Sequence, residues 1–403
     1  MIIINGETAK EFSELQDRIK KLNGKYKGPF IVATDTSRHS IMYSHLITGY
    51  LMSSGIEAVD LGPQPYPIAV YEMSKFNCEG MIYLSLADGT STVECLVVDN
   101  LIKPVKFDTP YVEGKEVGKY DRYTRCIEDY KNLLDRAKAK PEQRITIIID
   151  GGNGTGGAVY KLFDDYEVKL LYGQLGEPQP FATGERLSSL KSAISMFDAS
   201  LGIMFDSSCR KVLLMDGKGK VATPEQMIKM FSDVNMLIVH DRDIVSLPEA
   251  KNKLSEDVHF DSISLKGLGI TDDCLYIPGN VEDIKSYDPI CFAHLVLSKM
   301  LAAGKTKLYD AVSPDYSVRK EETVTTGLSE MPQENIKIYE GVSGEITKAA
   351  AVYGYVKYFR AGEGKENEGK DQGKVMARVV VKGDNLNDVE EKMGQILNEI
   401  KKR

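Results

Sequence analysis

The most constraining feature of this sequence is an apolar strand that runs straight into a glycine-rich turn. Residues Arg144–Asp150 are almost continuously apolar, Gly151–Gly157 is rich in glycine, and a helix is predicted from Ala158. A strand that is apolar on both faces has to be covered on both faces, as happens in a parallel sheet flanked by helices. The segment therefore predicts a unit of the α/β class.

Similar alternation of strands and helices occurs before and after this segment, and it predicts a mainly parallel sheet in each unit. The expected strands of the first unit lie at Pro29–Thr34, Ala58–Gly62 and Gly80–Leu86, with helices at Ser40–Ser53, Ala69–Lys75 and Tyr120–Ala139. The second unit continues with strand Val168–Tyr172, helix Leu187–Phe197 and strand Leu201–Phe205. A third begins at Met236–His240 and runs through Leu275–Ile277 to a helix at Ile290–Ala303.

The end of the chain differs, because Lys374–Lys382 alternates as a strand and Asn387–Lys401 is an amphipathic helix. The 403 residues are enough for several domains. We expect three mixed α/β domains at 1–140, 141–232 and 233–325, followed by a smaller α+β domain at 326–403.

Composition excludes several classes of partner. The net charge of −8 argues against nucleic acid. No run of about 18 apolar residues is present, so no membrane span is expected. The six cysteines form no Cys-x-x-Cys pair, and the start of the chain does not resemble a signal peptide, so a cytoplasmic location is expected.

Strand Leu201–Phe205 leads into a polar loop, Asp206-Ser207-Ser208-Cys209-Arg210-Lys211. With the glycine turn, the proline loop at Pro178–Pro180 and the pair Asp35-Thr36, this segment resembles the α-D-phosphohexomutases. These are the phosphoglucomutases, phosphomannomutases and phosphoglucosamine mutases. The resemblance implies four domains around a central cleft.

In that family the loop after this strand has the sequence Asp-Gly-Asp-Ala-Asp-Arg, and its carboxylates hold Mg²⁺. Here Asp206 matches the first ligand, and Ser208 stands where the second would be. Arg210 stands at the third position and Lys211 at the family arginine. The resemblance thus implies Asp206 and Ser208 as candidate ligands for Mg²⁺. Arg210 and Lys211 become candidate phosphate-binding residues, with Arg210 able to replace the cation.

The family's phosphoserine loop follows a strand like Gly80–Tyr83. Counting straight through places Leu86 at the nucleophile, whereas a shift of one residue places Ser85 there. A shift of one residue on a strand turns the side chain to the opposite face. The resemblance further implies Arg360 as a phosphate ligand in the last domain, and places Gly269–Asp273 near the position of the sugar-binding loop.

Each of these residues has a simpler interpretation. Asp206 could accept hydrogen bonds from backbone N–H groups in a tight turn, Ser85 could be a buried serine, and Arg360 a surface arginine. The glycines at 152, 154 and 157 also fit a dinucleotide fingerprint, although the next strand does not end in an acid. A dinucleotide-dependent oxidoreductase therefore remains an alternative.

We prefer a diverged phosphohexomutase-like protein with weak or no mutase activity, because the nucleophile, metal and sugar motifs all depart from the family. It would bind a hexose phosphate or a protein partner. The alternative is an active Mg²⁺-dependent mutase, acting on phosphorylated glucose, mannose or glucosamine, in which Ser85 carries the phosphoryl group.

Overall fold

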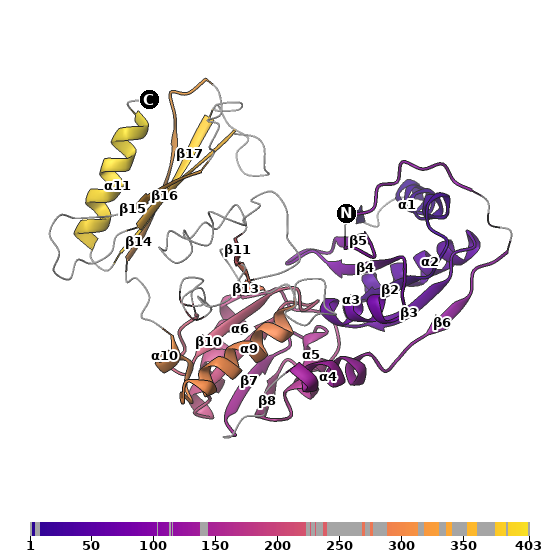
Figure 1. Cartoon of the computed structure of the whole chain (residues 1–403), viewed down its shortest axis with the longest axis horizontal. Helices are drawn as coiled ribbons and strands as arrows, with labels where there is room; N and C mark the ends of the chain where they lie inside the picture. Colours follow the sequence, from indigo (N-terminus) through magenta and orange to yellow (C-terminus); the bar gives the residue numbers. More distant parts are fainter. Residues whose placement is uncertain are drawn as a thin grey trace. The chain divides into compact units, whose positions relative to one another are not determined.

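The computed structural model describes most of the chain, and its described residues fall into two compact units (Figure 1). The larger unit holds the described residues of 1–224, 234–240 and 259–312, and the smaller one those of 225–233, 241–258 and 313–403. The described residues are 2–4, 9–102, 104–112, 114, 116–137, 144–222, 226, 230, 237–239, 268–270, 275–276, 288–312, 318–329, 336–340, 353–360, 375–383 and 386–401.

The larger unit begins with a six-stranded sheet whose order is β1-β5-β4-β2-β3-β6. Strands β2, β3, β4 and β6 are parallel, whereas β5 and β1 add an antiparallel edge that the sequence analysis did not predict. The strands are β1 (Ile2–Ile4), β2 (Phe30–Thr34), β3 (Ala58–Pro63), β4 (Gly80–Leu86), β5 (Val93–Asp99) and β6 (Tyr120–Arg122). The helices are α1 (Ala9–Lys21), η1 (Leu22–Gly24), α2 (Arg38–Ser53), α3 (Tyr66–Lys75) and α4 (Cys126–Ala137).

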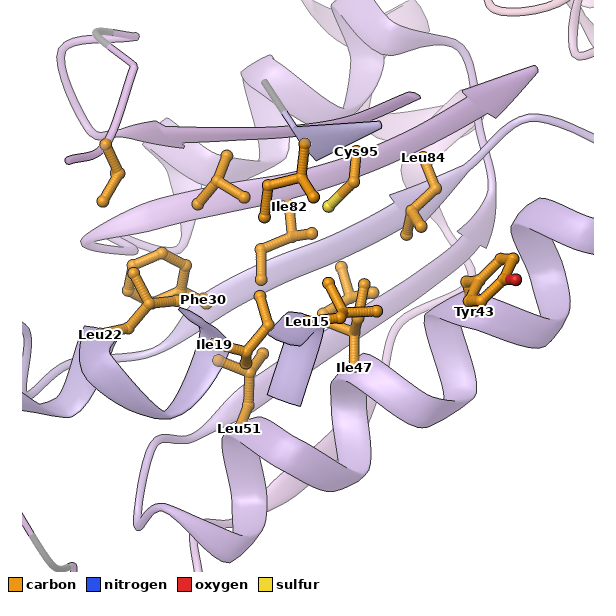
Figure 2. Close-up of a cluster of buried hydrophobic side chains, with 14 of the residues drawn as sticks. Leu15, Ile19, Leu22, Phe30, Tyr43, Ile47, Leu51, Ile82, Leu84 and Cys95 are labelled. Carbon is orange, nitrogen blue, oxygen red and sulfur yellow. The ribbon is translucent and has the colours of Figure 1, made fainter. Parts of the chain in front are cut away.

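Helices α1 and α2 cover one face of this sheet. Ile19 of α1 and Ile47 of α2 are fully buried with Ile82 and Leu84 of β4 in one apolar cluster (Figure 2). Side chains alternate along a strand, so Tyr83 points to the other face, where its ring meets Tyr66 of α3. Helix α3 therefore covers the second face, as expected for a sheet that is apolar on both sides.

The helix predicted at Tyr120–Ala139 is corrected by the structure. Residues Tyr120–Arg122 form β6, and the helix α4 begins only at Cys126. The cause is tertiary: the Tyr120 hydroxyl and the Arg122 guanidinium both donate to the Asp60 carboxylate of β3. Pairing with β3 thereby overrides the local preference of this segment.

A second sheet of the larger unit has seven strands in the order β11-β12-β13-β10-β9-β7-β8. This sheet contains strands from both sides of the domain boundary that the sequence predicted at 232/233. The four domain limits given above remain predictions. The strands are β7 (Thr146–Asp150), β8 (Glu167–Leu171), β9 (Leu201–Phe205), β10 (Val212–Asp216), β11 (Leu237–Val239), β12 (Leu268–Ile270) and β13 (Leu275–Tyr276). The helices are α5 (Gly156–Val159), η2 (Tyr160–Phe163), α6 (Gly184–Met196), α9 (Pro289–Ala302) and α10 (Leu308–Ala311).

The smaller unit is a four-stranded antiparallel sheet with one helix (Figure 1). The apolar side of helix α11 packs on valines of strands β16 and β17, through Val389, Met393 and Ile396. The elements are β14 (Val318–Thr325), β15 (Ile336–Glu340), β16 (Tyr353–Arg360), β17 (Val375–Gly383) and α11 (Leu386–Lys401). The α+β character expected for the end of the chain is confirmed.

Candidate functional site

A cavity of about 460 Å³ lies in the larger unit, where loops that follow β4 and β9 meet. Ligands commonly bind at the carboxyl ends of parallel strands, where such loops gather. The lining residues are Ser85, Leu86, Ala87, Asp88, Gly89, Thr90, Glu94, Glu177, Pro178, Gln179, Pro180, Asp206, Ser207, Ser208, Arg210 and Lys211. The structure thus brings together five of the six residues that the sequence singled out.

Ser85 and Leu86 take opposite directions at the end of β4. Leu86 packs against the same apolar cluster as Leu84, on the face covered by α1 and α2. Ser85 stands between these two leucines in the sequence, so its side chain points to the other face of the sheet. It is buried there and lines the cavity. Within the described part of the chain, its hydroxyl makes no hydrogen bond. Of the two positions considered for a nucleophile, only Ser85 has a side chain free of the core.

Asp35, at the end of β2, holds the backbone next to Ser85. One carboxylate oxygen accepts from the Leu86 N–H at 2.8 Å and the other from the Ser37 N–H at 3.0 Å. Burial raises the pKa of this carboxyl, and the two backbone hydrogen bonds oppose the shift. The sequence marked Asp35 only through the family resemblance. Its role here is to fix the strand end from which Ser85 projects.

The Asp206 carboxylate is bonded within its own loop. Its two oxygens accept from the Lys211 N–H at 2.9 Å and from the Ser208 hydroxyl at 3.0 Å. Burial raises the pKa of Asp206, while the Lys211 N–H and the Arg210 charge oppose that shift. Cys209 completes the tight turn with a φ of 55°. This is the simpler of the two interpretations of Asp206, an Asp that satisfies backbone N–H groups.

These residues do not fit Mg²⁺. The ion prefers octahedral oxygen ligands, usually including one or two carboxylates. Here the loop offers one carboxylate, already bonded to its own loop, and a Ser208 hydroxyl whose proton points at that carboxylate. Arg210 brings a positive charge to the same cavity. Among the described residues, no group of three or more His, Cys, Asp or Glu side chains is arranged to hold a metal.

The cations of the loop point into the cavity beside aromatic rings. The Arg210 guanidinium lies 5.9 Å from the centre of the Tyr66 ring, and the Lys211 ammonium lies 5.9 Å from that of Phe181. Arg210 also lies 3.8 Å from the Glu94 carboxylate. Both cations, predicted as phosphate ligands, line the cavity.

Three carboxylates of the cavity were not found from the sequence. Asp88 accepts from the Phe181 N–H at 2.8 Å, which links the loop after β4 to the proline loop. Glu177 lies 3.6 Å from Arg38. Glu94 could have been found, because Val93-Glu94-Cys95 alternates as a strand and places Glu94 away from the core.

The glycine turn is filled by the chain itself. A Cβ added at Gly154 would lie 2.6 Å from the Cα of Ser207, and one at Gly157 would lie 2.6 Å from the Gly173 carbonyl oxygen. The glycines are thus needed for close packing of neighbouring loops. At Gly154, the close backbone approach that the fingerprint attributes to a cofactor is made by Ser207 of the chain itself, which argues against a bound dinucleotide.

A buried ion pair supports this side of the cavity. Arg186 of α6 donates to both oxygens of Asp150, at 2.8 and 3.2 Å, and both side chains are fully buried. The same guanidinium donates to the carbonyl oxygens of Pro180, at 3.0 Å, and Phe205, at 2.9 Å. It joins the proline loop, the glycine turn and the end of β9, although the sequence analysis did not single it out.

Two remaining sequence predictions are not placed at this site. Arg360 ends β16 in the smaller unit, and its side chain lies outside the part of the chain that the structure describes. Only Gly269 and Ile270 of the segment Gly269–Asp273 are described, within β12. Among the described helices, none has both the length and the apolar character needed to cross a bilayer.

The fold is of the phosphohexomutase-like class. It has two mixed α/β sheets, then a small antiparallel sheet with one helix, and a cavity at strand ends of the larger unit. Residues 5–87 match the family model for phosphoglucomutase/phosphomannomutase, alpha/beta/alpha domain I. A solved structure of a phosphoglucomutase/phosphomannomutase family protein from Burkholderia thailandensis has a TM-score of 0.66. It has 12% identity and covers 98% of this chain and 94% of that one. A Paramecium parafusin structure, a phosphoglucomutase in its open form, has a TM-score of 0.63 at 10% identity, with 98% and 91% covered.

Curated proteins are similar to this chain in sequence, at low identity. A "Probable phosphoglucosamine mutase" of Methanococcoides burtonii is 26% identical over 57% of this chain and 57% of its own length. The phosphoglucosamine mutase of Pseudoalteromonas translucida is 22% identical over 87% of this chain and 82% of its own. The match thus spans little more than half of the first relative. The chain is thus similar in sequence to phosphohexomutases over part or most of its length, and it shares the fold of their solved structures.

Proposed function

We propose that the cavity binds a phosphorylated sugar without Mg²⁺, and that the protein has weak or no mutase activity. One observation carries the proposal: Arg210 and Lys211 line the cavity, while the Asp206 carboxylate is bonded within its own loop. The loop that would hold a metal therefore presents cations in its place. The proposal favours a hexose phosphate over a protein partner, because these charges face a cavity and not a flat surface.

Guanidinium and ammonium groups suit a phosphate, since they donate charge-assisted hydrogen bonds to its oxygens. The cavity volume of about 460 Å³ lies within the range of small-molecule sites. The polar side chains Ser85, Ser207 and Gln179 line the same space and supply donors and acceptors for sugar hydroxyls. A phosphate at Arg210 with a sugar beside these groups is the arrangement we expect.

Calorimetric titration of glucose 6-phosphate into the protein in EDTA tests this proposal. We expect Arg210→Gln and Lys211→Gln each to weaken binding by about tenfold or more, since a hydrogen bond to a charged group contributes about 1.5–3 kcal/mol. Lys218→Gln is the matched control, because Lys218 also lies over a ring, that of Tyr309 at 4.0 Å, and does not line the cavity. Absence of binding, or equal affinity in all four proteins, would refute the proposal.

A second candidate function is an active mutase that uses Ser85 as the acceptor of the phosphoryl group. The favourable observation is that Ser85 lines the cavity and its hydroxyl makes no hydrogen bond within the described residues. Asp206 and Ser208 would then have to bind Mg²⁺, and Arg360 the distal phosphate. Incubation with glucose 1,6-bisphosphate followed by intact mass measurement tests it. A covalent phosphoryl group that is lost in Ser85→Ala would favour the active enzyme.

A further inference from the structure

Glu94 lies directly opposite Ser85 in the antiparallel pair of β4 and β5. Its neighbours Val93 and Cys95 are fully buried in the cluster under α1 and α2. Alternation along β5 therefore turns Glu94 to the cavity face, as alternation along β4 does for Ser85. Side chains at directly opposed positions have Cβ atoms about 5 Å apart. Glu94 thus brings a carboxylate next to the only hydroxyl that β4 presents to the cavity.

The Glu94 carboxylate also faces Arg210. A carboxylate oxygen lies 3.8 Å from a guanidinium nitrogen, and the two side chains are 25% and 34% exposed. This separation exceeds hydrogen-bond distance, so the attraction is electrostatic. Ion pairs of this kind, partly in contact with solvent, contribute little to stability. The pair is therefore weak enough for a ligand to open it.

We propose that Glu94 is an internal competitor for Arg210, occupying the side of the guanidinium that a ligand phosphate would take. The inference rests on the proposed function, because it assigns a role to Arg210 in binding phosphate. A phosphate that enters the cavity has to displace the carboxylate and then remain close to it. Glu94 therefore lowers the affinity for anions and admits only ligands whose other contacts compensate.

Apart from Asp206, which is bonded within its own loop, the cavity has two other carboxylates, and both are placed differently. Asp88 is held by the Phe181 N–H, and Glu177 lies beside Arg38, whose side chain is almost fully exposed. Replacing Glu177 by Gln changes the net charge of the cavity by one unit, as Glu94→Gln does. It leaves the Glu94 carboxylate beside Arg210 in place. Glu177→Gln is therefore the matched control for Glu94→Gln.

The experiment titrates inorganic phosphate and glucose 6-phosphate into the full chain in EDTA, by calorimetry at low salt. Four proteins are compared first: the parent, Glu94→Gln, Glu177→Gln and Arg210→Gln. We expect Glu94→Gln to bind both ligands about fivefold more tightly than the parent, and Glu177→Gln to bind them less than about twofold more tightly. The same two Gln substitutions are then made in the Arg210→Gln protein, where their effects should become equal.

Each outcome separates the two proposals. A larger gain for Glu94→Gln that disappears in the Arg210→Gln background supports competition for the guanidinium. Equal gains for Glu94→Gln and Glu177→Gln, with binding still weakened by Arg210→Gln, overturn the role of Glu94 and leave the proposed function standing. Absence of phosphate binding in every protein overturns both. Thermal unfolding of each variant shows whether a lost signal reflects an unfolded protein.

Discussion

The buried pair Asp150–Arg186 gives the sharpest prediction about what holds the cavity walls in place. Substituting Asp150 by Asn keeps the size of the side chain and removes its charge. Arg186 then remains charged, fully buried and without its anionic partner. Removal of one member of a buried ion pair costs about 3–5 kcal/mol, because the other charge is left uncompensated.

The lower end of this range applies here. The Arg186 guanidinium keeps its hydrogen bonds to the carbonyl oxygens of Pro180 and Phe205, and Asn retains one oxygen that can accept from Arg186 or from the Gly152 N–H. We therefore expect Asp150→Asn to lower the free energy of unfolding by about 3 kcal/mol.

Urea denaturation followed by tyrosine fluorescence and circular dichroism measures this change. The matched control is Asp198→Asn, the same substitution in the same unit, at a pair with Lys307 in which Asp198 is 94% exposed. Asn also tolerates the positive φ of 46° at that position. We expect a loss of about 0–1 kcal/mol there. Equal losses in the two variants would refute the reasoning that burial makes the Asp150 pair important.

Three further predictions concern other parts of the larger unit. Burial, with a smaller contribution from Asp129 and against that of Lys75, raises the pKa of Glu72 from 4.5 to about 7. The folded state then holds this proton more tightly than the unfolded chain, so stability falls by about 3 kcal/mol as pH rises from 4.5 through 7. Glu72→Gln should remove that loss, as measured by urea denaturation at pH 5 and pH 8; an unchanged slope would contradict it. Gly154→Ala should lower the free energy of unfolding by about 1–3 kcal/mol, because the added Cβ would meet the Ser207 backbone. Gly184→Ala is the control: its Cβ would have nothing within 4 Å, so the same denaturation assay should show a neutral or slightly stabilising effect. Millimolar Mg²⁺ should leave the melting temperature unchanged, and a clear rise would show a metal site that binds the folded state.

The sequence predicted the parallel core well because its strands carry strong signals. Gly80–Leu86 and Leu201–Phe205 were predicted with the same limits that the structure shows. Both are apolar and end in polar loops, so pattern alone defines them. Strand β6 was missed because its three exposed residues owe their conformation to Asp60 of another strand. Such a partner, about sixty positions away, leaves no local trace in the sequence.

The sequence was enough to predict several of the residues that line the site, but not which of them contact one another. The resemblance drew attention to Ser85, Asp206 and Arg210, and the structure places them around one cavity. Whether Ser85 or Leu86 faces the cavity depended on strand register, which is fixed by packing against α1 and α2. The ion pairs of Glu94 and Arg186 join segments that are distant in sequence, so no spacing rule could indicate them.

The most direct test of the central claim is a ³¹P NMR mutase assay. The protein is given glucose, mannose and glucosamine 1-phosphates with Mg²⁺ and a hexose bisphosphate, beside an active phosphoglucosamine mutase as a control. A cavity that binds phosphate through Arg210 and Lys211, and lacks ligands for Mg²⁺, predicts little or no conversion to 6-phosphates. Robust Mg²⁺-dependent conversion that disappears in Ser85→Ala would contradict the account and establish an active mutase.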